Sequence, residues 1–145
     1  MKNILIVCAM IGMTLSTQAM ARDDRLKFPF EEFLKTEKAK EALLDIPVFF
    51  AGQQHGAVEK KWGEATTSRK TNAFNKSDQE ACQWVLLSAL KSLQERAIQE
   101  GMNAVINIKS NYKHQEFVSS SEFECGAGTF VAGVALKADI VKLVK

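Results

Sequence analysis

Two cysteines, Cys82 and Cys125, constrain the fold of this chain most strongly, because a bond between them would join two distant segments. Cys82 falls in the first turn of a predicted long helix, and Cys125 falls on the apolar face of a predicted strand. The remaining cysteine, Cys8, lies in an apolar leader. Thiol pairs in exported chains are normally oxidised, so we predict a Cys82–Cys125 disulfide. The alternative is two separate reduced thiols.

Residues 1–21 have the pattern of an export signal. Lys2 supplies a basic start, residues 4–15 form an apolar run, and Ala19-Met20-Ala21 offers the small-x-small pattern that signal peptidase reads. About a dozen apolar residues is too short to span a bilayer, which takes about 20. We therefore predict cleavage after Ala21 and a mature chain, 22–145, in the periplasm or secreted. The alternative is a retained N-terminal anchor.

The predicted disulfide has a structural role. It would close a loop of about 44 residues, for which the chain-entropy model gives roughly 4 kcal/mol of stabilisation. The sequence holds no Cys-x-x-Cys motif, the usual arrangement that lowers a thiol pKa for redox chemistry. We therefore expect the pair to staple helix to sheet.

Size and charge exclude several classes of function. The mature chain has the length of one ordinary domain with its own core. The formal net charge of the whole chain is +2, and cations and carboxylates are interspersed. Such a chain lacks the strong positive field that steers proteins to nucleic acid or to anionic membranes.

The N-terminal half of the mature chain predicts short elements. Pro29 suits the first turn of a helix, and Thr36 suits the cap of a second helical piece. The expected elements are a helix over Phe28–Leu44, in one or two pieces, strands over Val48–Ala51 and Lys60–Arg69, and a polar loop over Lys70–Lys76.

The next predicted element is a long amphipathic helix. Ser77 and Glu80 form a capping-box pattern at its start, and Gly101 is placed to end it. Apolar residues on two sides indicate packing between a sheet and the N-terminal helices. The apolar stripe consists of Cys82, Leu86, Ala89, Leu93 and Ala97, and the opposite side carries Trp84, Leu87 and Ile98.

Alternating apolar and polar residues predict three strands after the long helix. We infer an α+β fold in which N-terminal helices and one long helix pack on an antiparallel sheet that ends in a three-strand meander. The residues expected to face the core are Ala104, Ile106 and Ile108 in the first strand, Phe117, Phe123 and Cys125 in the second, and Phe130, Ala132, Val134, Leu136, Ala138 and Ile140 in the third.

The sequence shows no catalytic constellation. His55 and His114 lack neighbouring ligands at the short spacings of a zinc site, so surface positions explain them better. The serines at 119–121 lack the Gly-x-Ser-x-Gly turn of a nucleophile. The glycines between 126 and 133 lack the Lys-Ser/Thr of a phosphate loop. We therefore predict a protein without catalytic residues, bound metal or cofactor.

The segment from Ser68 to Lys76 is the most site-like stretch, because it mixes cations, amides and one aromatic before the positive end of the long helix. An anion or a partner protein would suit it, and the alternative is a well-ordered connection. The candidate partner-binding residues are Arg69, Lys70, Asn72, Phe74, Asn75 and Lys76.

Residues 97–108 read Ala-x-x-x-Gly-Met-Asn-Ala-Val-Ile-Asn-Ile, residues 132–136 read Ala-Gly-Val-Ala-Leu, and residues 62–65 read Trp-Gly-Glu-Ala. Together they resemble the core of the RcsF and YbjQ families. In RcsF, an envelope-stress sensor lipoprotein, a cysteine at the helix is bridged to one shortly before the closing glycine, and Cys82 and Cys125 occupy matching places. The chain lacks the second RcsF bridge and a lipidated N-terminus. YbjQ proteins form rings, so this resemblance favours a homo-oligomer.

A second resemblance covers nearly the whole chain. The stretches 69–78 and 124–128 are similar to those of small exported bacterial proteins that carry the label "excinuclease ATPase subunit". A repair ATPase needs a nucleotide loop and a basic DNA-binding surface, and the sequence has neither. Our leading hypothesis is a non-enzymatic periplasmic domain that binds another envelope component, without a nucleic-acid partner or a membrane anchor once the signal is removed. The alternative is a small-ligand or metal-binding periplasmic protein.

Overall fold

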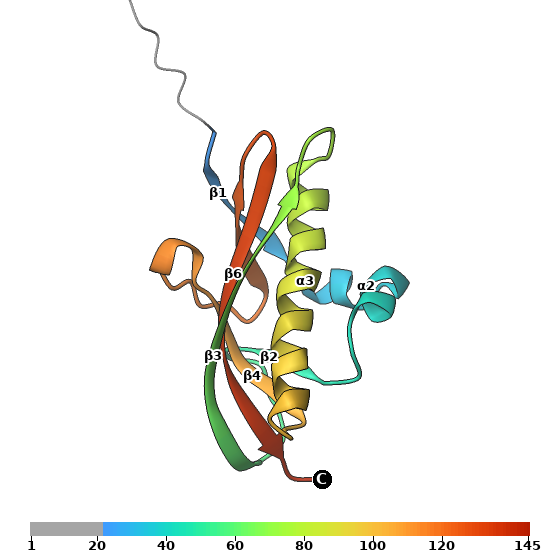
Figure 1. Cartoon of the computed structure of the whole chain (residues 1–145), viewed down its shortest axis with the longest axis vertical. Coiled ribbons are helices and arrows are strands. Elements are labelled where there is room, and N and C mark those ends of the chain that lie inside the picture. Colours follow the sequence, from blue (N-terminus) through green and yellow to red (C-terminus); the bar gives the residue numbers. More distant parts are fainter. Residues whose placement is uncertain (1–21) are drawn as a thin grey trace, which may run out of the picture.

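A six-stranded sheet covers one side of a 22-residue helix in the computed structural model, which describes residues 22–145 (Figure 1). The predicted α+β class, with a long helix packed on a mainly antiparallel sheet and short N-terminal helices, is confirmed. The strands are β1 (Asp24–Pro29), β2 (Val48–Phe50), β3 (Val58–Asn72), β4 (Ala104–Ser110), β5 (Glu122–Ala127) and β6 (Val131–Leu143). The helices are α1 (Glu31–Leu34), α2 (Glu37–Ala42), α3 (Asp78–Gln99) and the 3-10 turn η1 (Tyr112–His114).

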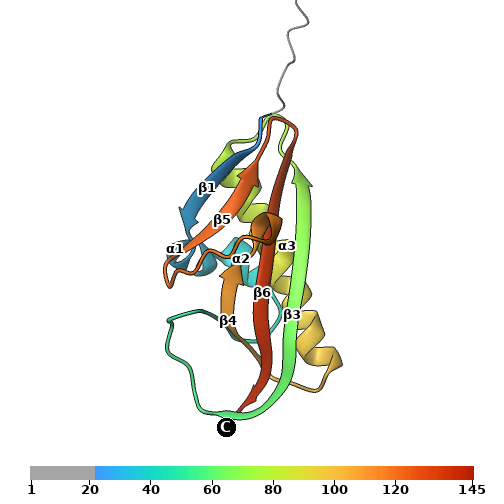
Figure 2. The same cartoon turned by 90° about the vertical axis from the view of Figure 1, so that its left-hand side faces the viewer.

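Strand β6 is the centre of the sheet (Figure 2). It pairs with β3 along one side, while β5 and β4 share its other side, β5 near its start and β4 near its end. Beyond them, β1 pairs with β5, and β2 pairs in parallel with β4. The last three strands therefore differ in order from the expected meander, in which the middle strand would be β5. The 13 residues of β6 are long enough to serve two shorter partners end to end.

The predicted boundaries of α3 are confirmed. The Ser77 hydroxyl accepts the Glu80 backbone N–H at 3.1 Å, as an N-cap does. At the other end Gly101 has a left-handed φ of +69°, and the N–H of Met102 donates to the Ala97 carbonyl at 2.8 Å. The Gly101 N–H donates to the Ile98 carbonyl at 3.1 Å, and the two bonds together form a Schellman motif.

The inner face of α3 forms the core with the sheet. Its predicted apolar stripe from Cys82 to Ala97 is fully buried. The opposite side was only partly predicted, because Leu87 is buried but Trp84 and Ile98 are 43% and 54% exposed. Helix α2 lies on the side of α3 away from β3 (Figure 1), where the amine of Lys38 lies 4.0 Å from the centre of the Trp84 ring and leaves that ring partly exposed.

The N-terminal segment corrects one prediction, because residues 24–29 form strand β1 and no helix begins at Phe28. Leu26 lies opposite Cys125, and Phe28 opposite Phe123. Pro29 lies at the end of this edge strand, where a missing N–H is tolerated. The predicted cap at Thr36 is confirmed, since its hydroxyl accepts the Ala39 N–H at 3.3 Å at the start of α2.

A bulge in β4 changes which residues face the core. Asn107 has a left-handed φ of 54°, and the register with β6 shifts between Ile106 and Lys109. Ile108 therefore faces α3, whereas Ile106 lies on the other face of the sheet in a small cluster with Val141. The prediction that Ala104 and Ile106 share the core face with Ile108 was wrong, because the bulge resets the alternation.

Strands β5 and β6 follow the predicted alternation over most of their length. Phe123, Cys125 and the β6 residues from Ala132 to Ile140 that were expected inside are buried. Two phenylalanines differ: Phe117 precedes β5, and Phe130 precedes β6 and is 64% exposed. Phe117 pairs with Ser110 of β4 in an isolated bridge, and Phe130 lies at the hairpin end, so the period-2 patterns of β5 and β6 do not determine their faces.

A buried glutamine fastens the segment between α2 and β2. The Gln94 side chain on α3 is 1% exposed. Its Nε2 donates to the carbonyls of Leu44 at 3.0 Å and Ile46 at 2.7 Å, and its Oε1 accepts the Leu44 N–H at 2.9 Å. One side chain thus satisfies three backbone groups of an irregular segment.

Candidate functional site

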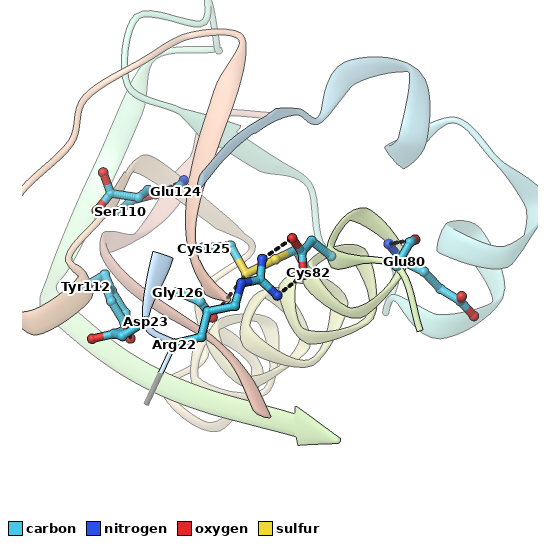
Figure 3. The surroundings of a disulfide bond; sticks show 11 residues. Arg22, Asp23, Glu80, Cys82, Ser110, Tyr112, Glu124, Cys125 and Gly126 are labelled. Carbon is cyan, nitrogen blue, oxygen red and sulfur yellow. Dashed lines mark hydrogen bonds and ion pairs between the residues drawn. A yellow bond between two sulfur atoms is a disulfide. The ribbon is translucent and has the colours of Figure 1, made fainter. Parts of the chain in front are cut away.

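The disulfide joins α3 to β5. Cys82, the fifth residue of the helix, is bonded to Cys125, 43 residues later (Figure 3), and both side chains are fully buried. The predicted pairing is confirmed. Because neither sulfur is accessible to a redox partner, the bond is structural.

The predicted partner-binding segment is divided between a strand and a turn. Arg69, Lys70 and Asn72 belong to β3, which is longer than the sequence indicated, so the polar loop expected over Lys70–Lys76 begins only at Ala73. Arg69 faces α3 and donates to the Ser92 hydroxyl at 3.0 Å. Lys70 lines a groove on the opposite face of the sheet. The six candidate residues therefore do not form one surface.

Phe74, Phe130 and Val131 form an exposed apolar cluster, which we name the aromatic tip. They are 54%, 64% and 48% exposed, and the two rings stack with centroids 5.7 Å apart and planes 18° apart. Phe74 follows β3 and Phe130 precedes β6, so two adjoining connections at one end of the molecule build the cluster (Figure 1). Phe74 was among the binding residues predicted from the sequence, whereas Phe130 was predicted to face the core.

Hydrogen bonds fix the turn that carries Phe74. The N–H of Ala73 donates to the Phe130 carbonyl at 2.8 Å, which ties the two halves of the tip together. Asn72 accepts the Phe74 N–H at 2.8 Å through Oδ1, and its carbonyl accepts the Lys76 amine at 3.0 Å. Asn75 has a left-handed φ of 60°, which asparagine tolerates well. Asn72, Asn75 and Lys76 therefore shape the tip.

Gly126 in β5 makes room for an aromatic ring that also lies against Gly133 in β6. A Cβ on Gly126 would lie 2.1 Å from Cζ of Tyr112, and a Cβ on Gly133, its partner in the register, would lie 3.7 Å from Cε2 of the same ring. The Tyr112 hydroxyl donates to Asp23 at 2.9 Å. Figure 3 shows Tyr112 beside Asp23 near the disulfide. The ring clamps the start of β1 onto the sheet.

Charged groups around this ring are paired. Arg25 contacts the carboxylate of Glu124 at 2.8 Å and donates to the Tyr112 carbonyl at 2.7 Å. A hydrogen bond from Lys113 lowers the pKa of Asp23, and the Tyr112 hydrogen bond lowers it further. Burial raises the pKa of the Tyr112 phenol, and its bond to Asp23 adds to that shift. Groups paired in this way hold segments together and offer no free acid or base.

A groove of about 430 Å³ lies between β3 and η1, on the sheet face away from α3. Its lining holds three basic side chains, Lys70, Lys113 and His114, and no carboxylate. Lys113 is already paired with Asp23. The full lining is Thr66, Thr67, Ser68, Lys70, Asn111, Tyr112, Lys113, His114 and Ala135.

The remaining candidates for chemistry lie apart. His55 and His114 are exposed, as expected, and lie in different loops. Within residues 22–145, no three His, Cys, Asp or Glu side chains gather to hold a metal ion. Ser119 accepts the N–H groups of Ser121 and Glu122 at 3.2 and 3.0 Å, so it orders a loop before β5.

The fold and its surface define a small disulfide-linked α+β domain with an aromatic tip and an open sheet edge along β3. None of the helices in the described range, 22–145, combines the length and apolar character that crossing a membrane requires. Comparisons with protein-family models, with curated proteins and with solved structures found no match to this chain.

Proposed function

We propose that this chain is an exported, non-enzymatic interaction module that binds a protein of the bacterial envelope through the aromatic tip. The single observation that carries the proposal is the stacked, exposed pair Phe74 and Phe130. The buried disulfide supports export, because such bonds persist in oxidising compartments. The predicted leader, with Ala19 and Ala21, lies outside the described residues. The resemblance to the RcsF and YbjQ families is in keeping with an envelope role.

The tip has the properties of a binding hot spot. Aromatic side chains carry a large share of binding energy at protein interfaces, because each buries a large apolar area at a small entropic cost. The turn beneath Phe74 is fixed by the hydrogen bonds of Asn72 and Ala73, so little ordering is needed on binding. A rigid, exposed aromatic pair therefore favours a partner with an apolar pocket.

The charges near the tip favour a protein over a lipid surface. Arg22 lies at the same end and is paired with Asp24 at 2.7 Å and with Asp78. The amine of Lys76 is bonded to a backbone carbonyl. A surface that docks on anionic lipid usually presents several free cations, each contributing about 1 kcal/mol. The tip lacks such a cluster within the described residues.

Photo-crosslinking in growing cells tests the proposal. A photoreactive phenylalanine analogue at Phe130 is expected to yield one discrete protein adduct, and Phe74→Ser is expected to reduce its yield at least about tenfold, as for loss of a hot-spot residue. The matched control places the same analogue at Val118, which is 56% exposed and lies in the connection between η1 and β5. Unchanged melting temperatures establish that each variant is folded.

Identical adducts from Phe130 and Val118, or an adduct insensitive to Phe74→Ser, would contradict the proposed contact. Flotation with vesicles of anionic phospholipid tests whether the tip binds a membrane surface in place of a protein. Vesicle binding that Phe74→Ser abolishes, without a protein adduct, would show that the tip docks on membranes and would replace the protein partner.

A second candidate function is the binding of a small anion in the groove between β3 and η1, where Lys70 and His114 face a lining free of carboxylates. Inorganic phosphate at about 100 times its dissociation constant would add roughly 2.7 kcal/mol of stability, seen as a higher melting temperature. Lys70→Ala is expected to remove this shift, and the control Lys91→Ala, on the exposed side of α3, is expected to keep it. A melting temperature unaffected by phosphate argues against this function.

A further inference from the structure

The outer edge of β3 is open. Among residues 22–145, β3 pairs only with β6, so the backbone groups on its other side have no strand partner. Its register is irregular before Gly63 and then continues without interruption from Gly63, opposite Ile140, to Asn72, opposite Val131. A long, regular and unpaired edge is a template for another strand.

The hydrogen-bond pattern shows which residues present their backbone to this edge. The Ala73 N–H points to β6, where it donates to Phe130. Along an antiparallel strand, the backbone N–H and C=O groups of successive residues point alternately to one side and to the other. The even-numbered residues of β3 therefore direct these groups outward, away from β6. Asn72 fits this alternation, because its carbonyl points outward and accepts a hydrogen bond from the Lys76 amine. That carbonyl is therefore already occupied at the C-terminal end of β3. The available residues are Glu64, Thr66, Ser68 and Lys70.

We propose that two copies of this chain pair through this edge in an antiparallel, two-fold symmetric dimer with Thr67 on the axis. In that register Glu64 lies opposite Lys70 of the second copy, and Thr66 lies opposite its Ser68. Every outward-facing residue then meets another outward-facing residue, as a hydrogen-bonded ladder requires. The edge is complementary to itself in charge, because each copy supplies one acid and one base at symmetric positions. Glu64 is half exposed and also lies 3.4 Å from Lys137 of its own chain, so it would be shared between two amines in the dimer.

The position of α3 fits this arrangement. The helix packs against both β3 and β6, so its axis lies between them. Neighbouring strands are about 4.8 Å apart, so the helix axis of α3 lies about 5 Å from the two-fold axis of the dimer, measured across the strands. The two copies of α3 are then about 10 Å apart. Packed helices lie about 8–10 Å apart. Ser92, whose hydroxyl is 3.2 Å from that of Thr67, is level with the axis and is small enough for this spacing.

The dimer would be reversible and would leave the proposed partner site free. The new contact consists of a short ladder and polar side chains, which is typical of small, transient interfaces, so we expect a dissociation constant in the micromolar range. Antiparallel pairing places the two aromatic tips at opposite ends. The inference is therefore independent of the proposed function.

Sedimentation velocity over a concentration series tests the dimer through charge exchange. Glu64→Lys alone and Lys70→Glu alone each place like charges opposite one another at two symmetric positions, so each is expected to weaken dimerisation at least about tenfold. The double variant E64K/K70E is expected to restore the wild-type dissociation constant to within about threefold. Within one copy the two residues are about 20 Å apart, so they cannot compensate each other there.

Two further variants separate pairing from folding. Ser68→Pro removes an outward N–H without touching the β6 ladder, and it is expected to abolish the dimer with little change in melting temperature. Glu59→Lys, on β3 outside the uninterrupted register, is the charge control and is expected to dimerise normally. The inference would be overturned if the wild-type chain stayed monomeric up to about 1 mM. A dissociation constant of that size corresponds to a binding free energy of only about 4.1 kcal/mol. A double variant as weak as the single ones would overturn the inference as well.

Discussion

Replacing Cys82 and Cys125 together with alanine is expected to lower the free energy of unfolding by about 3–4 kcal/mol. The bridge closes a long loop, since the cysteines are 43 residues apart, and the chain-entropy model gives about 4 kcal/mol for such a closure. Since domains of this size are stable by only about 5–15 kcal/mol, this loss is a large fraction of the total. Urea denaturation, followed by far-UV circular dichroism, measures it.

The structure also predicts how the loss depends on conditions. Both sulfurs are fully buried, so a mild reductant is expected to act only once the chain opens. The wild type in strong reductant should approach the stability of the double alanine variant, and the variant itself should be insensitive to reductant. A wild-type denaturation midpoint that does not change on complete reduction would contradict a stabilising bridge.

Replacing Gln94 with leucine is expected to cost about 2–4 kcal/mol, although leucine is apolar and similar in size. The change leaves the Leu44 N–H and the carbonyls of Leu44 and Ile46, which face the buried Gln94 side chain, without their partner. Each buried backbone group left unsatisfied costs about 1–3 kcal/mol, and partial relaxation toward water reduces the sum. The same urea experiment measures the effect.

Gln99→Leu is the matched control for this substitution. It makes the same chemical change five residues further along α3, where the side chain is exposed, and its effect should stay within about 0.5 kcal/mol. If the two variants were equally stable, the hydrogen bonds of Gln94 would not be holding the segment between α2 and β2.

Local signals explain what could be predicted from the sequence. The ends of α3 were predictable because Ser77 and Gly101 act on their own neighbours in the chain. The disulfide was predictable because only two cysteines follow the apolar leader. By contrast, Pro29 is typical of a helix start and predicts one at Phe28, but pairing with β5, about 100 residues later, makes residues 24–29 a strand. The central place of β6 likewise depends on strand lengths and partners that no local pattern encodes.

The candidate site was half predictable for a similar reason. Phe74 stands out because it is an aromatic in a polar stretch. Phe130 continues the alternation of apolar residues along β6, and this pattern predicts that it faces the core. In the structure it lies at the hairpin end, in solvent beside Phe74. The role of Gly126 depends on the distance to Tyr112, which lies in a different segment.

The pairing of β1 with β5 has a consequence for the order in which the domain is completed. The first strand meets its partner only after residues 122–127 have been made, and the central strand β6 is made later still. Contacts between such distant segments slow folding, because a long loop must close before any of them form. A chain built in this way stays open until almost all of it has left the ribosome or a translocation pore.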